Sequence, residues 1–258
     1  MHIVALHAFR DNYIWMIHNA HHALVVDPGD AGPVLAACQA QGLELAGILV
    51  THHHADHTGG IVELLADARV PVWGPASAAL PGMSHPLRAG DRVAVPELGL
   101  DFEVLHVPGH TLGHIAYSAG GGPGEPLLFC GDTLFSAGCG RLFEGTPAQM
   151  LASLDRLSRL PAATRVYCTH EYTLGNLQFA RRVEPGNPSV QAYAQWCSRQ
   201  RAEQLPTLPS TLGQELRVNP FLRVGEPEVL ASLAAHAGHA PADRVEAFTL
   251  LRQWKNDF

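Results

Sequence analysis

The hydrophobic pattern along the first two thirds of the chain alternates between short apolar runs and helix-like segments. Apolar runs rich in β-branched residues, such as HALVVDPG and LAGILVTHHH, stop at polar clusters and predict buried strands. Between them, DAGPVLAACQAQG carries apolar residues at helical spacing, and GGIVELLADA repeats that pattern. Further strands are predicted in VPVWGP, FEVLHVPGH, HIAYSA, PLLFCGD and RVYCTH. The pattern therefore indicates a mixed α/β domain.

The pattern changes near residue 172, where the strand signal stops. Four later segments have helical spacing: NLQFARRVEPGNP, VQAYAQWCSRQRAEQ, PEVLASLAAHAG and DRVEAFTLLRQWKNDF. The proline-rich stretch LPTLPSTLGQELRVNPFLR separates the second from the third, and we expect it to be extended. We therefore predict an α/β domain over residues 1–171 and a helical domain over residues 172–258.

Composition narrows the classes of protein that the chain can represent. It has 258 residues, with 17 Lys and Arg against 24 Asp and Glu, a formal charge of −7. An acidic chain without a basic run argues against nucleic-acid and anionic-membrane partners. No apolar run reaches the roughly 18 residues of a membrane span, and the start resembles no signal peptide, which predicts a cytoplasmic protein. Five scattered cysteines without CxxC spacing argue against disulfides and zinc fingers, whereas sixteen histidines point to imidazole ligands.

The stretch THHHADH concentrates metal-ligand chemistry in seven residues. If the strand before it continues, alternation places His52 and His54 on one side, where they can share a cation, and turns His53 away. Asp56 and His57 follow the strand end and can face a second cation.

Three further candidate ligands close later predicted strands: His110, Asp132 and His170. Seven ligands are too many for one tetrahedral ion, and they suit two divalent ions if a carboxylate bridges them, for which Asp132 is the natural choice. Nitrogen and oxygen ligands discriminate weakly among zinc, iron and manganese, of which we expect zinc. Asp27 is either a partner of a ligating imidazole or a turn aspartate.

Several other candidates have simpler interpretations. We expect His106 and His114, which flank the PGHT turn, to be structural or to support a ligand. Cys139 in GCGR has no activating neighbour in its motif, which favours a structural role over a nucleophilic one.

The motifs THHHADHTGG, VPGHTLGHIAY, CGDTLF and THEY resemble those of the metallo-β-lactamase superfamily. The segments RDNYIW, GCGRLFEG, HEYTLGNLQFARRVEPGN, NPFLR and LLRQWKNDF are similar to one of its families, the hydroxyacylglutathione hydrolases or glyoxalase II. The resemblance covers nearly the whole chain. It implies an αββα sandwich with a binuclear metal site, followed by a C-terminal α-helical domain that helps to bind glutathione.

The resemblance also assigns roles to residues. It implies that His52, His54 and His110 hold one metal, that Asp56, His57 and His170 hold the other, and that Asp132 bridges. Asp56 and Asp132 are the expected catalytic carboxylates. The substrate contacts that it implies are Arg141, Phe143, Tyr172, Arg252 and Lys255. Phe143 stands where many members carry tyrosine, which removes a hydroxyl contact to glutathione.

The implied activity is hydrolysis of S-(2-hydroxyacyl)glutathione, such as S-D-lactoylglutathione, to glutathione and D-lactate, the second step of methylglyoxal detoxification (EC 3.1.2.6). A metal-bound hydroxide would attack the thioester carbonyl. We expect a monomer. Four alternatives remain: a persulfide dioxygenase, a β-lactamase, a nuclease and a non-catalytic metal-binding protein of the same fold. The first two should lack the helical extension, a nuclease should carry basic patches, and a non-catalytic protein should have lost ligands.

Overall fold

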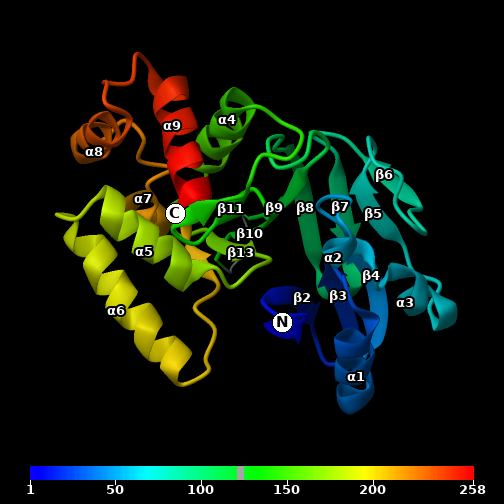
Figure 1. The fold of residues 1–258 in the computed structure, drawn as a ribbon. Coiled ribbons are helices and arrows are strands. Elements are labelled where there is room, and N and C mark those ends of the chain that lie inside the picture. The colour runs from blue at the N-terminus through cyan, green and yellow to red at the C-terminus, as the bar shows by residue number, and fades with distance from the viewer. Residues whose placement is uncertain (121–124) are drawn as a thin grey trace. The chain divides into compact units, whose positions relative to one another are not determined.

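The computed structural model describes residues 1–120 and 125–258, and the chain divides into two compact units (Figure 1). The first unit comprises Met1–His106 and Gly113–Gly131, and the second comprises Val107–Leu112 and Asp132–Phe258. The predicted domains, residues 1–171 and 172–258, have other boundaries than these units. They describe sequence modules of the chain, and they stay a prediction.

The first unit contains a six-stranded mixed sheet in the order β1-β2-β3-β4-β5-β6. Its strands are β1 (His2–Ala8), β2 (Asn12–His18), β3 (His22–Val26), β4 (Glu44–Leu49), β5 (Val72–Pro75) and β6 (His85–Leu87). Strands β1 to β3 pair antiparallel, and β3 to β6 pair parallel. Parallel strands end at the same edge of a sheet, so the loop after β4 lies where α/β proteins place functional groups.

Helices α1 (Ala31–Gln41) and α3 (Ile61–Asp67) pack on this sheet (Figure 1). Val34 of α1 and Leu64 of α3 share a core with Ile14 and Ile48 of the strands. The side chain of Asp30 caps the start of α1, and Gly42 ends it in the left-handed region at φ 63°. The sequence predicted both helices.

A second group of strands in the first unit pairs antiparallel in the order β10-β9-β8-β7. These are β7 (Arg92–Val95), β8 (Leu100–His106), β9 (Ile115–Ala119) and β10 (Leu127–Gly131), with a short 3₁₀ helix, η1 (Pro96–Leu98), between β7 and β8. The hydroxyl of buried Tyr117 in β9 donates to the carbonyl of Val50 at 2.9 Å, which joins this group to the loop after β4.

The second unit is mainly helical: α4 (Pro147–Leu157), α5 (Thr173–Val183), α6 (Pro188–Ala202), α7 (Leu212–Val218), α8 (Pro227–Ala237) and α9 (Arg244–Asp257). It also contains the paired strands β13 (Arg165–Cys168) and β14 (Ser210–Thr211) and the hairpin β11 (Leu134–Phe135) and β12 (Gly138–Cys139). Leu177, Val190 and Val218 form a core between α5, α6 and α7. Thr146 and Gln149 form a capping box at the start of α4, whose first residue is Pro147.

Two helices differ from the sequence-based expectation. Helix α7 lies inside the stretch that we expected to be extended; Thr211 caps it by accepting from the Gln214 amide. A single turn, α2 (Ala55–Thr58), follows the histidine cluster. In both places a short polar helix lacks the repeated apolar spacing on which the prediction depends.

Candidate active site

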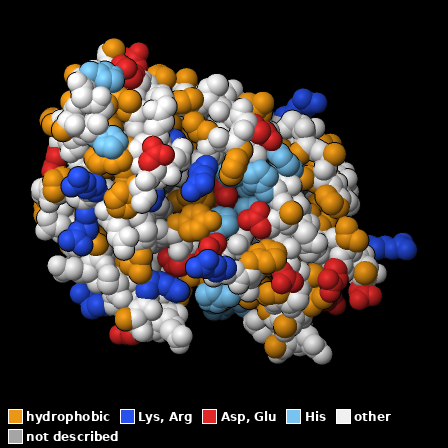
Figure 2. All heavy atoms as spheres, viewed as in Figure 1, with side chains coloured by type: hydrophobic (Ala, Val, Ile, Leu, Met, Phe, Trp, Pro, Cys, Tyr) orange, Lys and Arg blue, Asp and Glu red, His pale blue; other side chains and the backbone are white. Residues whose placement is uncertain are grey.

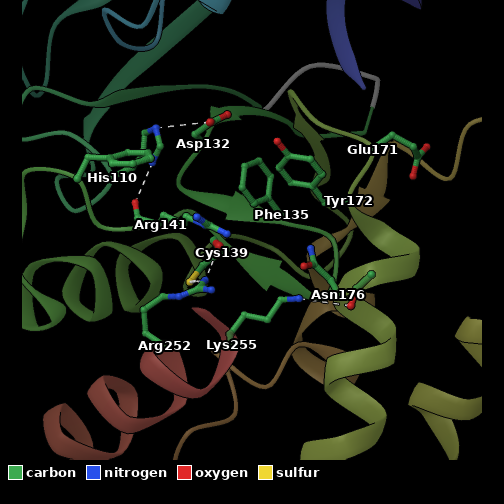
Figure 3. Close-up of a pocket in the computed structure, with 12 residues that line it drawn as sticks. His110, Asp132, Phe135, Cys139, Arg141, Glu171, Tyr172, Asn176, Arg252 and Lys255 are labelled. Atoms are coloured by element: carbon green, nitrogen blue, oxygen red, sulfur yellow. Dashed lines mark hydrogen bonds and ion pairs between the residues drawn. The ribbon is translucent and has the colours of Figure 1, made fainter. Parts of the chain in front are cut away.

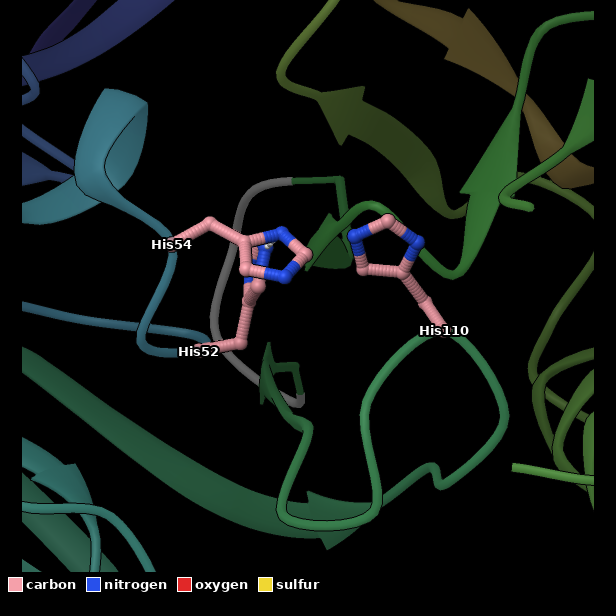
Figure 4. A group of neighbouring side chains, drawn as sticks. All are labelled: His52, His54 and His110. Carbon is pink, nitrogen blue, oxygen red and sulfur yellow. Dashed lines mark hydrogen bonds between the residues drawn. The ribbon is translucent and has the colours of Figure 1, made fainter. Parts of the chain in front are cut away.

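The first group of candidate ligands lies in the loop that follows β4. Strand β4 ends at Leu49, so the alternation argument for His52 and His54 is wrong in detail: they lie in a bend, and His54 precedes α2 with φ −62° and ψ 148°. Their rings are nevertheless neighbours, with His52 Nε2 and His54 Nδ1 3.1 Å apart, as Figure 4 shows. Two nitrogens on one tetrahedral zinc, each at about 2.0–2.1 Å, lie about 3.3–3.4 Å apart. The pair therefore fits one shared cation.

Buried Asp27 sets the orientation of this loop. Its carboxylate accepts from the Thr51 amide and the Thr51 hydroxyl, both at 2.7 Å. Because the only hydroxyl proton of Thr51 goes to Asp27, Thr51 Oγ1 accepts from His52 Nδ1 at 3.1 Å. The proton of His52 therefore resides on Nδ1, and Nε2 keeps the lone pair that a metal needs.

Asp27 supports His57 in the same way. The Nδ1 atom of fully buried His57 lies 3.1 Å from Asp27 Oδ2, so the carboxylate favours a proton on Nδ1 and leaves Nε2 for a ligand. His57 Nε2 lies 3.6 Å from Asp56 Oδ2, which also accepts from Asn12 Nδ2 at 3.1 Å. Asp27 therefore contacts the imidazole of a candidate ligand, which is one of the two roles expected for it. Its φ of 52° is uncommon for a residue other than glycine.

The remaining histidines of these motifs differ in their environments. His53 is exposed, whereas His114 is fully buried and stacks on His52 with ring centroids 4.6 Å apart. His106 at the end of β8 is exposed. His114 therefore supports a candidate ligand by packing.

The second unit brings together His110, Asp132 and His170, which come from three distant loops. Asp132 Oδ2 lies 3.5 Å from His110 Nε2 and 3.4 Å from His170 Nε2, and all three side chains are buried. His110 Nδ1 donates to the carbonyl of Arg141 at 2.8 Å, which leaves Nε2 without a proton (Figure 3). One carboxylate oxygen therefore faces two imidazole nitrogens at distances that suit shared cations.

A cavity of about 620 Å³ opens beside these three residues, entirely within the second unit (Figure 3). It is lined by His110, Asp132, Phe135, Cys139, Arg141, Phe143, Glu171, Tyr172, Gly175, Asn176, Arg252 and Lys255. All five predicted substrate contacts are in this set. The ring of Tyr172 stacks on His170 with centroids 4.7 Å apart, and Phe143, 64% exposed, meets His110 edge-on at 5.2 Å. Aromatic side chains thus flank two of the candidate ligands.

Arg252 and Lys255 both reach the cavity from α9 but differ in environment. Arg252 is only 5% exposed; it donates to the carbonyl of Cys139 at 2.9 Å and lies over the ring of Phe221 at 5.0 Å. Arg252 is therefore a buried side chain held by the second unit. Lys255 is partly buried, with Nζ 5.3 Å from the ring centroid of Phe179. Burial lowers the pKa of Lys255, and the nearby Arg252 and Arg141 lower it further.

Sequence reasoning missed several residues that line the cavity. Phe135, Glu171, Gly175 and Asn176 lie inside the motifs that carry the resemblance but were assigned no role, and Cys139 was expected to be structural. Burial raises the pKa of the Cys139 thiol, although Arg252 opposes that shift, so the residue is a poor nucleophile. A signal for Asn176 existed: it lies four residues after Tyr172, one turn further along the start of α5.

Surface charge and hydropathy agree with the composition. On the face shown in Figure 2, the described Lys and Arg side chains are separated by other residues and form no continuous basic stripe. Within residues 1–120 and 125–258, no helix combines the length and the apolar character that a membrane crossing requires.

Comparison with known proteins first defines the class. Residues 8–170 match the model of the metallo-beta-lactamase superfamily. The fold is similar to the crystal structure of ETHE1 from Myxococcus xanthus, with a TM-score of 0.66 and 25% identity over 99% of this chain and 100% of that one. It is also similar to the B3 metallo-beta-lactamase BLEG-1, with a TM-score of 0.61 and 24% identity over 86% of this chain and 98% of that one. The chain thus has the metallo-beta-lactamase fold, with two sheets and a helical C-terminal region.

The C-terminal region and full-length relatives define the family. Residues 171–258 match the model described as hydroxyacylglutathione hydrolase C-terminus. The chain is 55% identical to a hydroxyacylglutathione hydrolase of Albidiferax ferrireducens over the whole of both chains. It is 50% identical to one of Nitrosomonas eutropha, over 99% of this chain and 98% of that relative. The chain therefore belongs to the hydroxyacylglutathione hydrolase family, also called glyoxalase II.

Membership confirms the predicted family, fold class and enzyme class, a thioester hydrolase (EC 3.1.2.6). The helical extension, which matches this family's own model, also disfavours a persulfide dioxygenase and a β-lactamase. The His/Asp donors, in a chain of this superfamily, suggest a binuclear metal site.

Proposed function

We propose that this enzyme hydrolyses S-D-lactoylglutathione to D-lactate and glutathione at two metal ions, most simply zinc, with iron or manganese as alternatives. His52, His54 and His110 would hold one ion, Asp56, His57 and His170 the other, and Asp132 would bridge them. The observation that carries the proposal is Asp132 Oδ2, which faces His110 and His170 at 3.5 and 3.4 Å beside a cavity with cationic walls.

The donor set fits divalent cations of this kind. Every proposed ligand is an imidazole or a carboxylate, the ligands that zinc, iron and manganese share. Thr51 favours a lone pair on Nε2 of His52, and Asp27 does the same for His57. The Arg141 carbonyl does the same for His110. When bound, the two cations would supply Lewis acidity to water and to the thioester carbonyl.

The chain's own groups would then bind and orient the substrate. S-lactoylglutathione carries two carboxylates, and Arg141 and Lys255 offer cations on the cavity wall for them. Tyr172 and Phe143 flank His170 and His110, where they would exclude water from the side of the thioester. No side chain needs to protonate the leaving group, because the glutathione thiol has a pKa of about 8.5 and leaves readily as a thiolate.

Steady-state kinetics of the metal-loaded enzyme tests this proposal. We expect equal amounts of free thiol and D-lactate from S-D-lactoylglutathione, and a much higher KM for a small thioester that lacks the glutathione peptide. A metal-loaded enzyme that releases no thiol from S-D-lactoylglutathione would contradict it. We also propose a cytoplasmic location and a monomer, which fractionation and light scattering would test.

A further inference from the structure

The hairpin β11–β12 connects two parts of the proposed site. It lies between Asp132, the proposed bridging ligand, and Arg141, a proposed substrate contact, and its Phe135 and Cys139 line the cavity. Its two strands form only two residue pairs, Leu134 with Cys139 and Phe135 with Gly138. A two-stranded hairpin is at best marginally stable by itself, and one this short needs support from outside.

That support comes from helix α7. The carboxylate of Glu215 accepts from the Ala137 amide at 2.7 Å and from the Ser136 hydroxyl at 3.0 Å, at the hairpin turn. Asn219, just after α7, donates through Nδ2 to the carbonyls of Phe135 and Gly138, at 3.1 and 2.9 Å. Ala137 has φ 55°, a left-handed conformation that a residue with a Cβ adopts at a cost. Two side chains thus hold four backbone or hydroxyl groups of one turn.

Other helices of the second unit bind the same hairpin. Asn176 of α5 donates to the Ser136 carbonyl at 3.0 Å. Arg252 of α9 donates to the Cys139 carbonyl at 2.9 Å, as Figure 3 shows. Side-chain hydrogen bonds therefore fix the hairpin to α5, α7 and the segment just after it, and α9.

Because these hydrogen bonds are buried, the loss of one of them costs more free energy than it would at the surface. Glu215 and Asn219 are both fully buried, so a lost partner leaves a polar group without water to replace it. Burial raises the pKa of Glu215, which the surrounding hydrogen-bond donors oppose. A buried carboxylate is costly unless its neighbours fix it, and here two of those neighbours, the Ala137 amide and the Ser136 hydroxyl, belong to the hairpin that follows Asp132.

We propose that Glu215 and Asn219 are positioning residues for the reaction: by fixing the hairpin, they hold Asp132 and Arg141 in place at the cavity. The inference rests on the proposed function, because it assigns these residues an effect on catalysis. It also gives the helical region a part in the chemistry as well as in substrate affinity.

The test compares Glu215→Gln with Glu184→Gln in the full-length, metal-loaded enzyme. Glutamine keeps the shape of Glu215 but removes one acceptor, so the Ala137 amide or the Ser136 hydroxyl loses its partner. Glu184 is a matched control: it is 1% exposed, and its hydrogen bonds in the described part of the chain go to Arg223 and Asn187, away from the hairpin.

Two readouts separate positioning from general stability. The first is hydrogen exchange of the peptide covering residues 133–141. The second is kcat/KM on S-D-lactoylglutathione and on a small thioester, measured well below both melting temperatures. For Glu215→Gln we expect faster exchange and a loss of about 10-fold or more on both substrates, because the reacting centre is displaced. Glu184→Gln should melt earlier but keep wild-type exchange in this peptide and wild-type kcat/KM.

Two results would overturn the inference: wild-type kcat/KM in Glu215→Gln, or an equal loss in Glu184→Gln. If Glu215→Gln does not fold, Asn219→Ser carries the same test, since it removes both carbonyl contacts and leaves Glu215. Wild-type enzyme that hydrolyses only the small thioester would contradict the proposed substrate, while the comparison of variants on that thioester would still decide this inference.

Discussion

The candidate ligands of the two units are supported in different ways. In the first unit, one buried carboxylate, Asp27, orients Thr51 and His57 and, through Thr51, His52. In the second unit, His110 is oriented by the backbone of Arg141, and Asp132 precedes a hairpin that the helices hold. In the first arrangement a single residue supports its neighbours. The second depends on contacts that helices far away in sequence make with the hairpin. The second also borders the cavity, so it combines metal donors with substrate contacts.

Asp132→Ala should give the largest effect, because the variant removes the one donor proposed to serve both ions. We expect kcat to fall roughly 10³-fold or more, a barrier increase of about 4 kcal/mol or more, with loss of at least one metal ion. His53→Ala is the control, since His53 is exposed and makes no proposed contact to metal. Kinetics and elemental analysis of both variants check this. If the two variants behaved alike, the proposed roles of the ligands would be wrong.

Arg252→Ala tests how far the candidate ligands of the second unit depend on the helices that hold the hairpin. Because Arg252 is buried and donates to the Cys139 carbonyl, its loss should lower the free energy of unfolding by about 1.5–3 kcal/mol. We expect kcat to fall as well as KM to rise. Chemical denaturation and steady-state kinetics measure both quantities. A variant of unchanged stability with only a higher KM would mean that Arg252 serves the substrate alone.

Lys255→Ala should have a smaller and more selective effect. We expect KM for S-D-lactoylglutathione to rise about 5- to 30-fold, equivalent to about 1–2 kcal/mol, with kcat within a few-fold of wild type. A thioester without the glutathione carboxylates should show no difference between the variant and the wild type. Equal losses on both substrates would instead assign Lys255 to the fold.

The pH dependence of KM gives a finer test of Lys255. Its lowered pKa means that the ammonium loses its proton below the ordinary lysine value of 10.5, so attraction for a carboxylate is present at neutral pH and declines as pH rises. In the wild type, KM should therefore rise at alkaline pH, with a midpoint below 10.5. In Lys255→Ala this rise should disappear. A wild-type profile that is flat up to pH 10 would contradict the role.

Local parts of the site were readable from sequence, and long-range parts were not. The motif from His52 to His57 carries its candidate donors in adjacent positions, and the ends of predicted strands added His110, Asp132 and His170 to the predicted set. The support for these residues was harder to predict. Helix α7 was taken as extended because prolines flank it, and Glu215 therefore had no predicted position. Burial of Arg252 depends on packing against Phe221 and Cys139, residues far from it in the chain.

The central proposal is that the seven candidate ligands hold two metal ions. Elemental analysis of enzyme purified without chelator, combined with activity during stepwise reloading of the apo protein, tests it most directly. We predict about two divalent ions per chain and full thioester hydrolysis only after the second equivalent is added. Full activity with a single tightly bound ion would contradict the claim.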